Sequence, residues 1–533
     1  MSENLGPSAP GEEPEYLEPI AGTPTSRAVA VSGGQGKRRG ALLGAGLVGA
    51  GVVGAGAWAA TMFFATGAQP TEALPASTLA YVSVDVEPSG QQQVEAYRFL
   101  DKFPAIRAEL NLEDDTDLRE ELFSWTQEKG GCADVDFTED IEPWMGTTAA
   151  LAAVDLGADK IAPVLVLQVT DEAKADSGLA ALRECAGAED MGGWSIADGW
   201  AVIAEDSATA EGVASATKAA PLSEEAEHAD WLEEVGDLGV LTIYAGPEAP
   251  RRLMDLAQKQ QIDPEPLLDS YRDLYDDFTG AAGTLRFADE GLEFVAVSDA
   301  LLGGGDGSGG SAGGSVAALP TDTVAALGLS FGKEFVARIS TELAPTLSGT
   351  PDADALEQLE LQTGLTLPED LQTILGDSLV VAVGGGIDIE ALANSTDASD
   401  IPVGVKITGD AAGIESVIDK LRAALGPAGE QFLGSDVSGD VVAVGPSPEY
   451  RVALLSNGDL GGSDTFKSVI ADQDDASTVA FVDFDAANKW LDRALESSGE
   501  TDLIANVEPL SGLGILLGEE GEITRMTLRL ATR

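Results

Sequence analysis

The sequence contains one histidine and two cysteines in 533 residues, and this scarcity excludes several common catalytic designs. A serine or cysteine nucleophile activated by histidine would have to use His228, which lies in the acidic, helix-like stretch SEEAEHADWLEEV. We expect a solvated helical histidine there. The HExxH, CxxC and P-loop motifs are missing, which removes the commonest zinc and nucleotide signatures. The sequence therefore indicates no catalytic, cofactor-binding or metal-binding residue, and we expect no cofactor.

Basic residues are also few, because 30 lysines and arginines stand against 91 aspartates and glutamates, for a net charge of −61. Residues 1–66 hold five acidic and four basic side chains, which leaves 86 against 26, or −60, for residues 67–533. Such a surface repels phosphate groups, so we expect no nucleic-acid partner. Among so many acids some carboxylate pair always has a spacing suited to glycoside hydrolysis, and the pattern alone is uninformative.

Charge is absent altogether from residues 41–66, ALLGAGLVGAGVVGAGAWAATMFFAT. A helix of this length, with a rise of about 1.5 Å per residue, exceeds the ~30 Å hydrocarbon core of a bilayer. Lys37, Arg38 and Arg39 precede it, and no basic residue follows before Arg98. The positive-inside rule then predicts a transmembrane signal anchor. A cleaved signal peptide is the alternative.

This orientation predicts a single-pass protein of the cell membrane, with its N-terminus in the cytoplasm and residues 67–533 outside. Residues 1–40 are rich in Pro, Gly, Ser and Glu and have little to bury, so we expect a disordered cytoplasmic tail. Apart from the membrane itself, the expected partner is a ligand or a protein of the cell envelope. The oligomeric state is not predicted.

A glycine-rich stretch, GGGDGSGGSAGGS at residues 303–315, matches both GxGxxG and GxSxG. Nucleotide and hydrolase motifs of these types need a strand before them, and none is expected here. The composition is instead typical of a flexible linker. We predict that it separates two folded parts, residues 67–302 and 316–533.

These two parts have similar sequence patterns. ALPASTLAYVSVDV begins at Ala73 and ALPTDTVAALGLSF at Ala318, and each is an Ala-Leu-Pro opening followed by an alternating apolar run. Four later blocks recur in the same order, the last being the hairpin-like pair GTLRFADEGLEFVAV and GILLGEEGEITRMTL. We predict an α+β fold of two tandem pseudo-repeats, each with a largely antiparallel sheet that is covered by helices on one face.

The start of the chain resembles a known family. The basic cluster, the Gly/Ala-rich span, ALPASTLAYVSVDVEPSG, YRFLDKFPAI (97–106) and CADVDFTEDIEPWMG (132–146) follow one another in its order. The sequence looks like an actinobacterial family of membrane-anchored proteins that carry a domain of unknown function. The resemblance implies a single membrane span and an extracytoplasmic domain, and it implies no activity or catalytic residue.

The two cysteines, Cys132 and Cys185, both lie in the first part, on the predicted outside. An oxidising compartment favours a disulfide between them. Closing a loop of just over 50 residues stabilises a fold by about 4 kcal/mol on the chain-entropy model. Two free buried thiols, or a redox or intermolecular role, are the alternatives.

Two classes of function fit these patterns. The first is a non-enzymatic protein of the cell envelope that binds or scaffolds a lipid, peptide, polymer or protein partner, and it predicts an apolar groove. The second is a hydrolase that works through carboxylates alone, and it predicts two acidic residues that converge in a cleft. The near absence of histidine favours binding.

Overall fold

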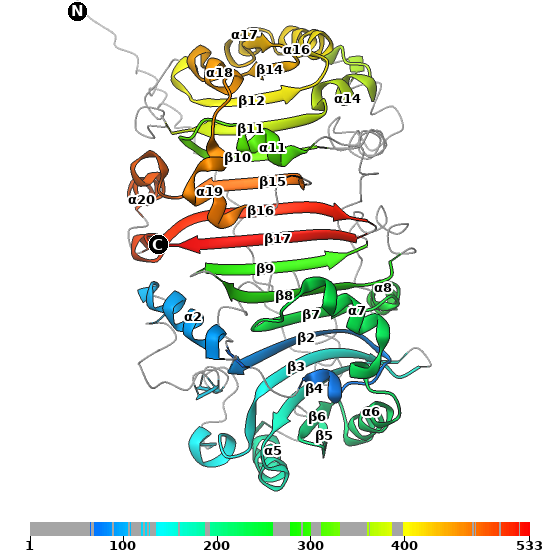
Figure 1. Ribbon diagram of the computed structural model, residues 1–533. Helices are drawn as coiled ribbons and strands as arrows, with labels where there is room; N and C mark the ends of the chain where they lie inside the picture. Colours follow the sequence, from blue (N-terminus) through cyan, green and yellow to red (C-terminus); the bar gives the residue numbers. More distant parts are fainter. Residues whose placement is uncertain are drawn as a thin grey trace, which may run out of the picture.

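The structure is a computed structural model of the chain, and Figure 1 shows its course. It describes residues 64–65, 69–87, 90–104, 135–157, 160–186, 192–259, 278–288, 291–299, 311–330, 363–385, 398–471, 476–499, 503–521 and 523–533, with a few single positions between them. The predicted cytoplasmic tail lies outside the described residues. We call residues 69–299 the first half and residues 311–533 the second half.

One part of the predicted membrane span is described. Phe64–Ala65 form strand β1, which pairs in parallel with the end of β2 (Thr78–Glu87). Phe64 and Ala65 are extended and pair with β2, so the helix predicted for residues 41–66 does not include them. Among the residues that the structure describes, no helix has both the length and the hydropathy to cross a bilayer. The rest of the predicted span lies outside them.

The strands occur in the same order in both halves, and successive side chains along each strand point to opposite faces of the sheet. The first half has β2, β3 (Met145–Asp155), β4 (Ile161–Val169), β5 (Gly193–Ala197), β6 (Trp200–Ala204), β7 (Leu241–Ala245), β8 (Ala281–Ala288) and β9 (Gly291–Ser298). The second half has β10 (Thr323–Leu329), β11 (Ser378–Gly384), β12 (Val403–Thr408), β13 (Ser435–Ser438), β14 (Val441–Val444), β15 (Ala476–Asp483), β16 (Leu510–Glu520) and β17 (Ile523–Thr532).

Helices fill the connections between the strands. The described α-helices are α2 (Gly90–Asp101), α5 (Glu172–Ala186), α6 (Ser207–Ala219), α7 (Ala226–Val235), α8 (Ala249–Lys259), α11 (Ala312–Ala317), α14 (Glu369–Leu375), α16 (Ala411–Leu425), α17 (Pro427–Phe432), α18 (Pro448–Leu455), α19 (Asp464–Val469), α20 (Ala486–Ser498) and α21 (Ile504–Val507). The short helical turns are η1 (Pro70–Glu72), η2 (Phe137–Ile141), η3 (Leu222–Glu224), η4 (Ala398–Asp400) and η5 (Leu460–Gly462).

All strands except β1 join one antiparallel sheet, which confirms the prediction of an α+β fold with a largely antiparallel sheet. Its order is β5-β6-β4-β3-β2-β7-β8-β9-β17-β16-β15-β10-β11-β12-β14-β13. The order in one half mirrors the order in the other, and the ladder between β9 and β17 joins them (Figure 1).

The registers of the two halves agree in detail. In β2, Val82 lies opposite Leu151 of β3, and in β10, Leu327 lies opposite Val381 of β11. The register shifts between Thr78 and Ala80 in the first half, and between Thr323 and Ala325 in the second. The first strand of each half thus has an irregularity at its start, two residues from Thr78 and from Thr323.

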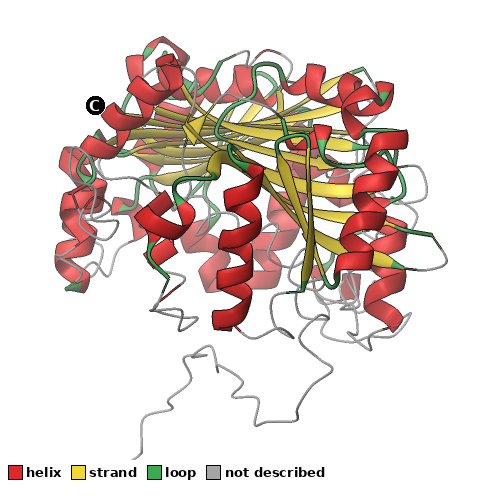
Figure 2. Ribbon diagram, turned by 90° about the horizontal axis from the view of Figure 1, so that it is seen from below, coloured by secondary structure: helices red, strands yellow, loops and turns green. Residues whose placement is uncertain are grey.

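Helices cover both faces of the sheet, as Figure 2 shows. On one face, called here the α7 face, the core includes Tyr81, Val164 and Val295 and packs on α6 and α7, while α11, α18 and α19 cover the same face in the second half. On the opposite face, called the α5 face, α2, α5 and α16 pack on the strands. The prediction of one covered face is therefore wrong, because the strands carry apolar residues on both sides and both sides must be shielded.

The end of the predicted linker is also helical. Ser311 caps α11, with its Oγ accepting a hydrogen bond from the backbone N–H of Gly314 (3.2 Å). Ala312 and Val316 are buried, and Val316 joins the core on the α7 face. Residues 312–315 are thus not a flexible linker, because small residues let this helix lie close against β10 and β15. Residues 303–310 lie outside the described residues.

Candidate functional site

The single histidine is buried rather than solvated, which corrects the expectation from its acidic surroundings. His228 lies on α7 with an exposed fraction of 3%. Its ring lies against the rings of Tyr81 and Tyr244, and its Nε2 shares a hydrogen bond of 3.0 Å with the Tyr81 hydroxyl. Burial lowers the pKa of His228 to about 4. The imidazole is therefore neutral at pH 7 and enclosed in the core.

A sequence signal for this burial existed. His228, Trp231 and Val235 occupy positions i, i+3 and i+7 of α7, the spacing that places residues on one face of a helix. All three are buried. The glutamates of the same stretch lie on the solvent-facing side of the helix, so they gave no information about the environment of His228.

Cys185 lies on an exposed position of α5 and forms a disulfide bond. Cys132 lies outside the described residues. The pairing of Cys132 with Cys185 therefore stays a prediction. The disulfide would join α5 to the segment that precedes η2. The helix α5 and the turn η2 already pack together in a core that contains Trp144 and Leu179.

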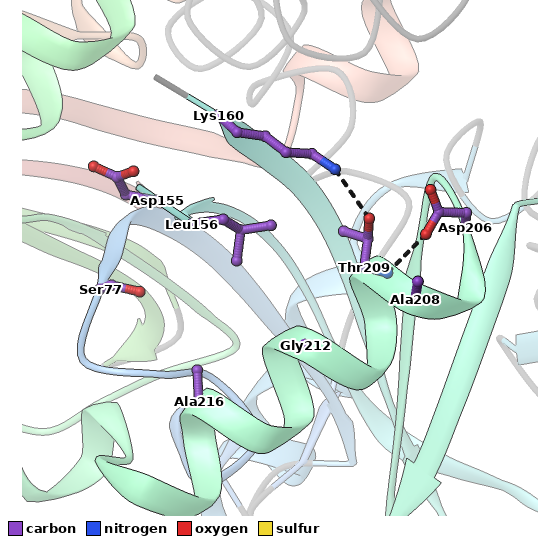
Figure 3. Close-up of a pocket in the computed structure, with 9 residues that line it drawn as sticks. All are labelled: Ser77, Asp155, Leu156, Lys160, Asp206, Ala208, Thr209, Gly212 and Ala216. Atoms are coloured by element: carbon purple, nitrogen blue, oxygen red, sulfur yellow. Dashed lines mark hydrogen bonds between the residues drawn. The ribbon is translucent and has the colours of Figure 1, made fainter. Parts of the chain in front are cut away.

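A pocket of about 550 Å³ opens beside the N-terminus of α6 and is shown in Figure 3. Its polar lining comes from Ser77, Asp155, Lys160, Asp206 and Thr209. Lys160 Nζ contacts Glu205 at 2.6 Å and donates a hydrogen bond to Thr209 Oγ1 at 3.1 Å. The side chain of Asp206 caps α6 by accepting from the backbone N–H of Thr209 at 2.7 Å.

These contacts pair the charged groups of the pocket with groups of the protein. The hydrogen bond with Glu205 raises the pKa of Lys160, and the hydrogen bonds with Thr209 lower the pKa of Asp206. The remaining carboxylate, Asp155, accepts a hydrogen bond from Arg252 Nη2 at 2.8 Å. Each charge thus has a partner within the protein.

Hydrolysis by two carboxylates needs one carboxyl whose pKa is raised, so that it can donate a proton at neutral pH. Asp206 has the opposite shift. Burial does raise the pKa of Asp483, but this side chain accepts backbone hydrogen bonds from Asp485 and Ala486 at the start of α20, which is a capping role. Among the described residues, no group of three or more His, Cys, Asp or Glu side chains is placed to hold a metal ion.

The α5 face carries a different feature, a row of apolar residues that lie opposite one another across twelve neighbouring strands from β4 to β12. We call it the apolar row. In strand order it consists of Leu167, Ala149, Val84, Leu241, Leu285, Phe294, Leu528, Ile515, Ala480, Leu327, Val381 and Val405. It crosses the β9–β17 seam without interruption, because the sheet is continuous there.

Accessibility differs along this row, because Val84 and Leu241 are buried in the core with α2. Leu327 and Val381, which lie directly opposite each other on β10 and β11, have exposed fractions of 40% and 37%. Near the other end, Leu165 of β4 faces the same side and is 37% exposed. Leu327 and Val381 thus form a small accessible apolar patch on interior strands of the sheet.

The sequence analysis identified the strands but not this row. Each strand is apolar on both faces, so alternation alone did not show which face stays accessible. The row depends on the register between strands distant in sequence, such as β9 with β17, and register is not visible in one sequence. The sequence analysis predicted an apolar groove but named no residues for it.

Comparison with known proteins identifies the family. A family model described as "Protein of unknown function (DUF3352)" matches residues 41–377, which is more than half of the chain, and the chain belongs to this family. The match includes the predicted membrane span, the first half and the second half as far as the residue before β11. Comparisons with curated proteins and with solved structures found no match. The predicted resemblance to a domain-of-unknown-function family is confirmed, and the actinobacterial origin and the membrane anchor stay predictions.

Proposed function

We propose that this family member is a non-catalytic binding protein of the cell envelope that holds an apolar ligand against the α5 face of its sheet. The observation that carries the proposal is the apolar row, with Leu327 and Val381 more than a third exposed on interior strands. Burying such side chains under a ligand contributes about 25 cal/mol per Å² of apolar surface. A face of this kind is a disadvantage for a protein in water unless something covers it.

The alternative, a carboxylate-dependent hydrolase, has less support. In the described pocket, Asp155 and Asp206 are paired with Arg252 and with the N-terminus of α6. The hydrogen bonds of Asp206 with Thr209 lower its pKa, which is the opposite of what a proton-donating carboxyl needs. Binding therefore agrees better with the described side chains than hydrolysis does.

We further propose that the two halves are copies of one module, joined after duplication. The mirrored strand order and the matching bulges near Thr78 and Thr323 support this. An antiparallel β9–β17 ladder relates the copies by an approximate twofold rotation, and this arrangement extends one sheet to twice its length. The duplication would thus lengthen the binding face by repeating one module rather than by adding a different domain.

Residues 41–66 and the cluster Lys37 to Arg39 support an anchor that keeps residues 67–533 outside the cytoplasm. The described fold begins at the end of this segment, since β1 is formed by Phe64–Ala65 and η1 starts at Pro70. The proposed binding face would therefore lie near a membrane surface, where apolar ligands are abundant.

Native mass spectrometry of the full chain, extracted from its own membrane, tests the binding proposal. The wild-type protein should carry a discrete additional mass, and Leu327→Asp should lose it because a charge next to an apolar ligand is costly. The matched control is Val452→Asp, on an exposed position of α18 that covers the α7 face, and it should keep the mass. A wild-type protein that is always free of ligand would overturn the proposal.

A further inference from the structure

We infer that helix α7 is an acid-sensitive cover of the first half: protonation of His228 releases the N-terminal part of α7 from the sheet, whereas the matching helix α19 of the second half does not respond. Such a device would act independently of the proposed ligand, because α7 lies on the face opposite to the α5 face. Four properties of the described residues lead to it: the comparison of the two halves, the hydrogen bonding of the imidazole, the charges around α7 and the attachment of its two ends.

Helices α7 and α19 are equivalent elements of the two halves. They lie on the same face of the sheet, on opposite sides of the β9–β17 ladder (Figure 1). His228 of α7 lies six positions after Leu222 of η3. Phe466 of α19 lies six positions after Leu460 of η5. All four residues are buried, so His228 and Phe466 occupy matching places over the two halves of the sheet.

The ring contacts beneath the two helices correspond as well. The ring of His228 lies against that of Tyr244 on β7, with 4.7 Å between the two centroids. The ring of Phe466 lies against that of Phe481 on β15, with 5.2 Å between the centroids. The first pair therefore consists of two titratable rings, and the second pair consists of two hydrocarbon rings.

The third member of each cluster differs in the same way. Tyr81 of β2 lies opposite Tyr244. Its counterpart, Ala326 of β10, lies opposite Phe481. The first half thus places one imidazole and two hydroxyl groups where the second half has hydrocarbon side chains, although buried polar groups cost free energy unless they are hydrogen-bonded. The fold can close this space without a titratable group, so the histidine is a specific feature of the first half.

The surroundings of the imidazole favour its neutral form. His228 has an exposed fraction of 3%, and its Nε2 shares a hydrogen bond of 3.0 Å with the hydroxyl group of Tyr81. A neutral ring can accept this bond, whereas a protonated ring has two N–H donors and no acceptor. Protonation in place would therefore turn the hydroxyl proton of Tyr81 away from the ring and bury a positive charge. Contact with water removes this penalty, so acid favours the released helix.

The charged groups around α7 lie towards solvent or near its C-terminal end. The acidic residues of α7, its N-cap and η3 are exposed or half-buried: Glu224, Glu225, Glu227, Asp230, Glu233 and Glu234. On the strands beneath, Arg286 and Glu293 pair near the C-terminus of α7, and Asp85 accepts a hydrogen bond from Thr148. The two tyrosines that touch the imidazole stay neutral, because burial raises their pKa values. A protonated imidazole would approach the surface carboxylates more closely once the helix has left the sheet.

The two ends of α7 are attached unequally. At the C-terminal end, Arg525 Nη1 donates a hydrogen bond of 2.8 Å to the carbonyl oxygen of Glu234. At the N-terminal end, the side chain of the N-cap residue Glu225 makes no capping hydrogen bond. In α19 the N-cap residue Ser463 does, because its Oγ accepts from the backbone N–H of Phe466 at 3.1 Å. An uncapped helix start is less stable than a capped one, so release begins at the end of α7 that carries the imidazole.

Hydrogen exchange of the full chain at pH 7 and pH 5, followed by mass spectrometry, tests this device. The exchange rate of each peptide is divided by its intrinsic rate at the same pH. The corrected rate in α7 should rise about twentyfold, as expected for a histidine whose pKa is about 4 when buried and 6.5 when solvated. The corrected rate in α19 should change by less than about twofold, and β2 and β7 should keep their protection.

Variants assign the response to the imidazole. His228→Phe introduces the residue that the second half has at the matching position, and it should abolish the rise in α7. His228→Gln keeps a polar side chain that does not titrate, and it should abolish the rise as well. The matched control is Asp230→Asn, which removes an exposed carboxylate from the same helix and should leave the rise unchanged.

Three results would overturn the acid-sensitive cover. An equal rise in α7 and α19 would show a general effect of acid on the many carboxylates. An equal rise in α7, β2 and β7 would show that the first half unfolds as a whole and does not release one helix. A rise that persists in both His228 variants would assign the response to another group.

Discussion

Glu293 of β9 and Arg529 of β17 form an ion pair across the ladder that joins the two halves of the sheet. They lie directly opposite each other, and Arg529 Nε donates to Glu293 Oε2 at 2.5 Å. Arg286 of β8 lies opposite Glu293 on the other side and donates to Oε1 at 2.6 Å. Burial alone would raise the pKa of Glu293, but the two arginines lower it overall. One buried carboxylate thus accepts hydrogen bonds from two guanidinium groups at the seam.

Glu293→Gln should therefore destabilise the protein more than Arg529→Gln. Removing the Glu293 carboxylate weakens two charge-assisted hydrogen bonds, which costs about 3 kcal/mol, and leaves two partly exposed guanidinium groups close together. In Arg529→Gln the carboxylate keeps Arg286, so the loss should be about half as large. Urea unfolding followed by tryptophan fluorescence measures both. A loss in Arg529→Gln that equals or exceeds that in Glu293→Gln would contradict this arrangement.

The pH dependence of stability should contain a contribution from His228. Its pKa is about 4 in the folded protein, against 6.5 for an ordinary histidine. Between these values the unfolded chain binds a proton that the folded protein does not, so stability falls as the pH falls from 6.5 towards 4. The full effect is about 3 kcal/mol, and about 2 kcal/mol is reached by pH 5.

Because many carboxylates also affect acid stability, the variant His228→Gln is the appropriate reference. The difference in unfolding free energy between wild type and His228→Gln should shift by about 2 kcal/mol in favour of the variant between pH 7 and pH 5. Since the chain has one histidine, its imidazole signals in an NMR titration are unambiguous. A midpoint near 6.5 would show that the ring is solvated after all.

The sequence predicted the elements of this fold better than their registers. The first block match, in which Ala-Leu-Pro recurs 245 positions later, agrees with the structure, where Val82 and Leu327 are equivalent. By sequence alone, PVLVLQVTD (163–171) aligns with PVGVKITGD (402–410), and this alignment pairs Leu165 with Gly404. In the structure Leu165 corresponds to Val405, because each faces the equivalent residue of the preceding strand. Strands that are apolar on both faces permit such a shift of one residue, and only the ladders resolve it.

The candidate site was harder to predict, for the same reason. Neither Leu327 nor Val381 differs in type from the buried residues beside it, and exposure depends on which helices lie over a strand. The burial of His228, by contrast, was predictable from the sequence, because its helical spacing from Trp231 and Val235 places all three on one face of α7. Local patterns thus report on helix faces, while the accessible side of a two-faced sheet depends on tertiary packing.

Two glycines inside helices should respond in opposite ways to alanine. A Cβ atom on Gly178 of α5 would lie 2.2 Å from Nε1 of the buried Trp144 and 2.8 Å from the carbonyl oxygen of Asp140. Overpacking of this kind costs about 1 to 3 kcal/mol, which outweighs the gain in helix propensity. Gly212 of α6 is exposed and has no atom within 4 Å of such a Cβ.

Gly178→Ala should therefore lower the melting temperature, and Gly212→Ala should raise it by an amount that corresponds to at most about 1 kcal/mol. Differential scanning calorimetry of the two variants beside wild type measures the shifts. Because Gly212 lines the pocket of Figure 3, its variant also narrows that pocket without touching the apolar row. Stabilisation by Gly178→Ala would mean that α5 and Trp144 are not in contact.

The predicted disulfide between Cys132 and Cys185 should stabilise the first half through the unfolded chain. Joining residues just over 50 positions apart restricts the unfolded ensemble by about 4 kcal/mol on the chain-entropy model. The double variant Cys132→Ser/Cys185→Ser should therefore unfold at a lower temperature than the oxidised wild type, and wild type under reducing conditions should match the variant. Peptide mapping without reductant should recover the two cysteines in one linked fragment. If both thiols react with an alkylating reagent in the native, oxidised protein, the bond does not form, and the stability of the core around Trp144 and Leu179 must come from packing alone.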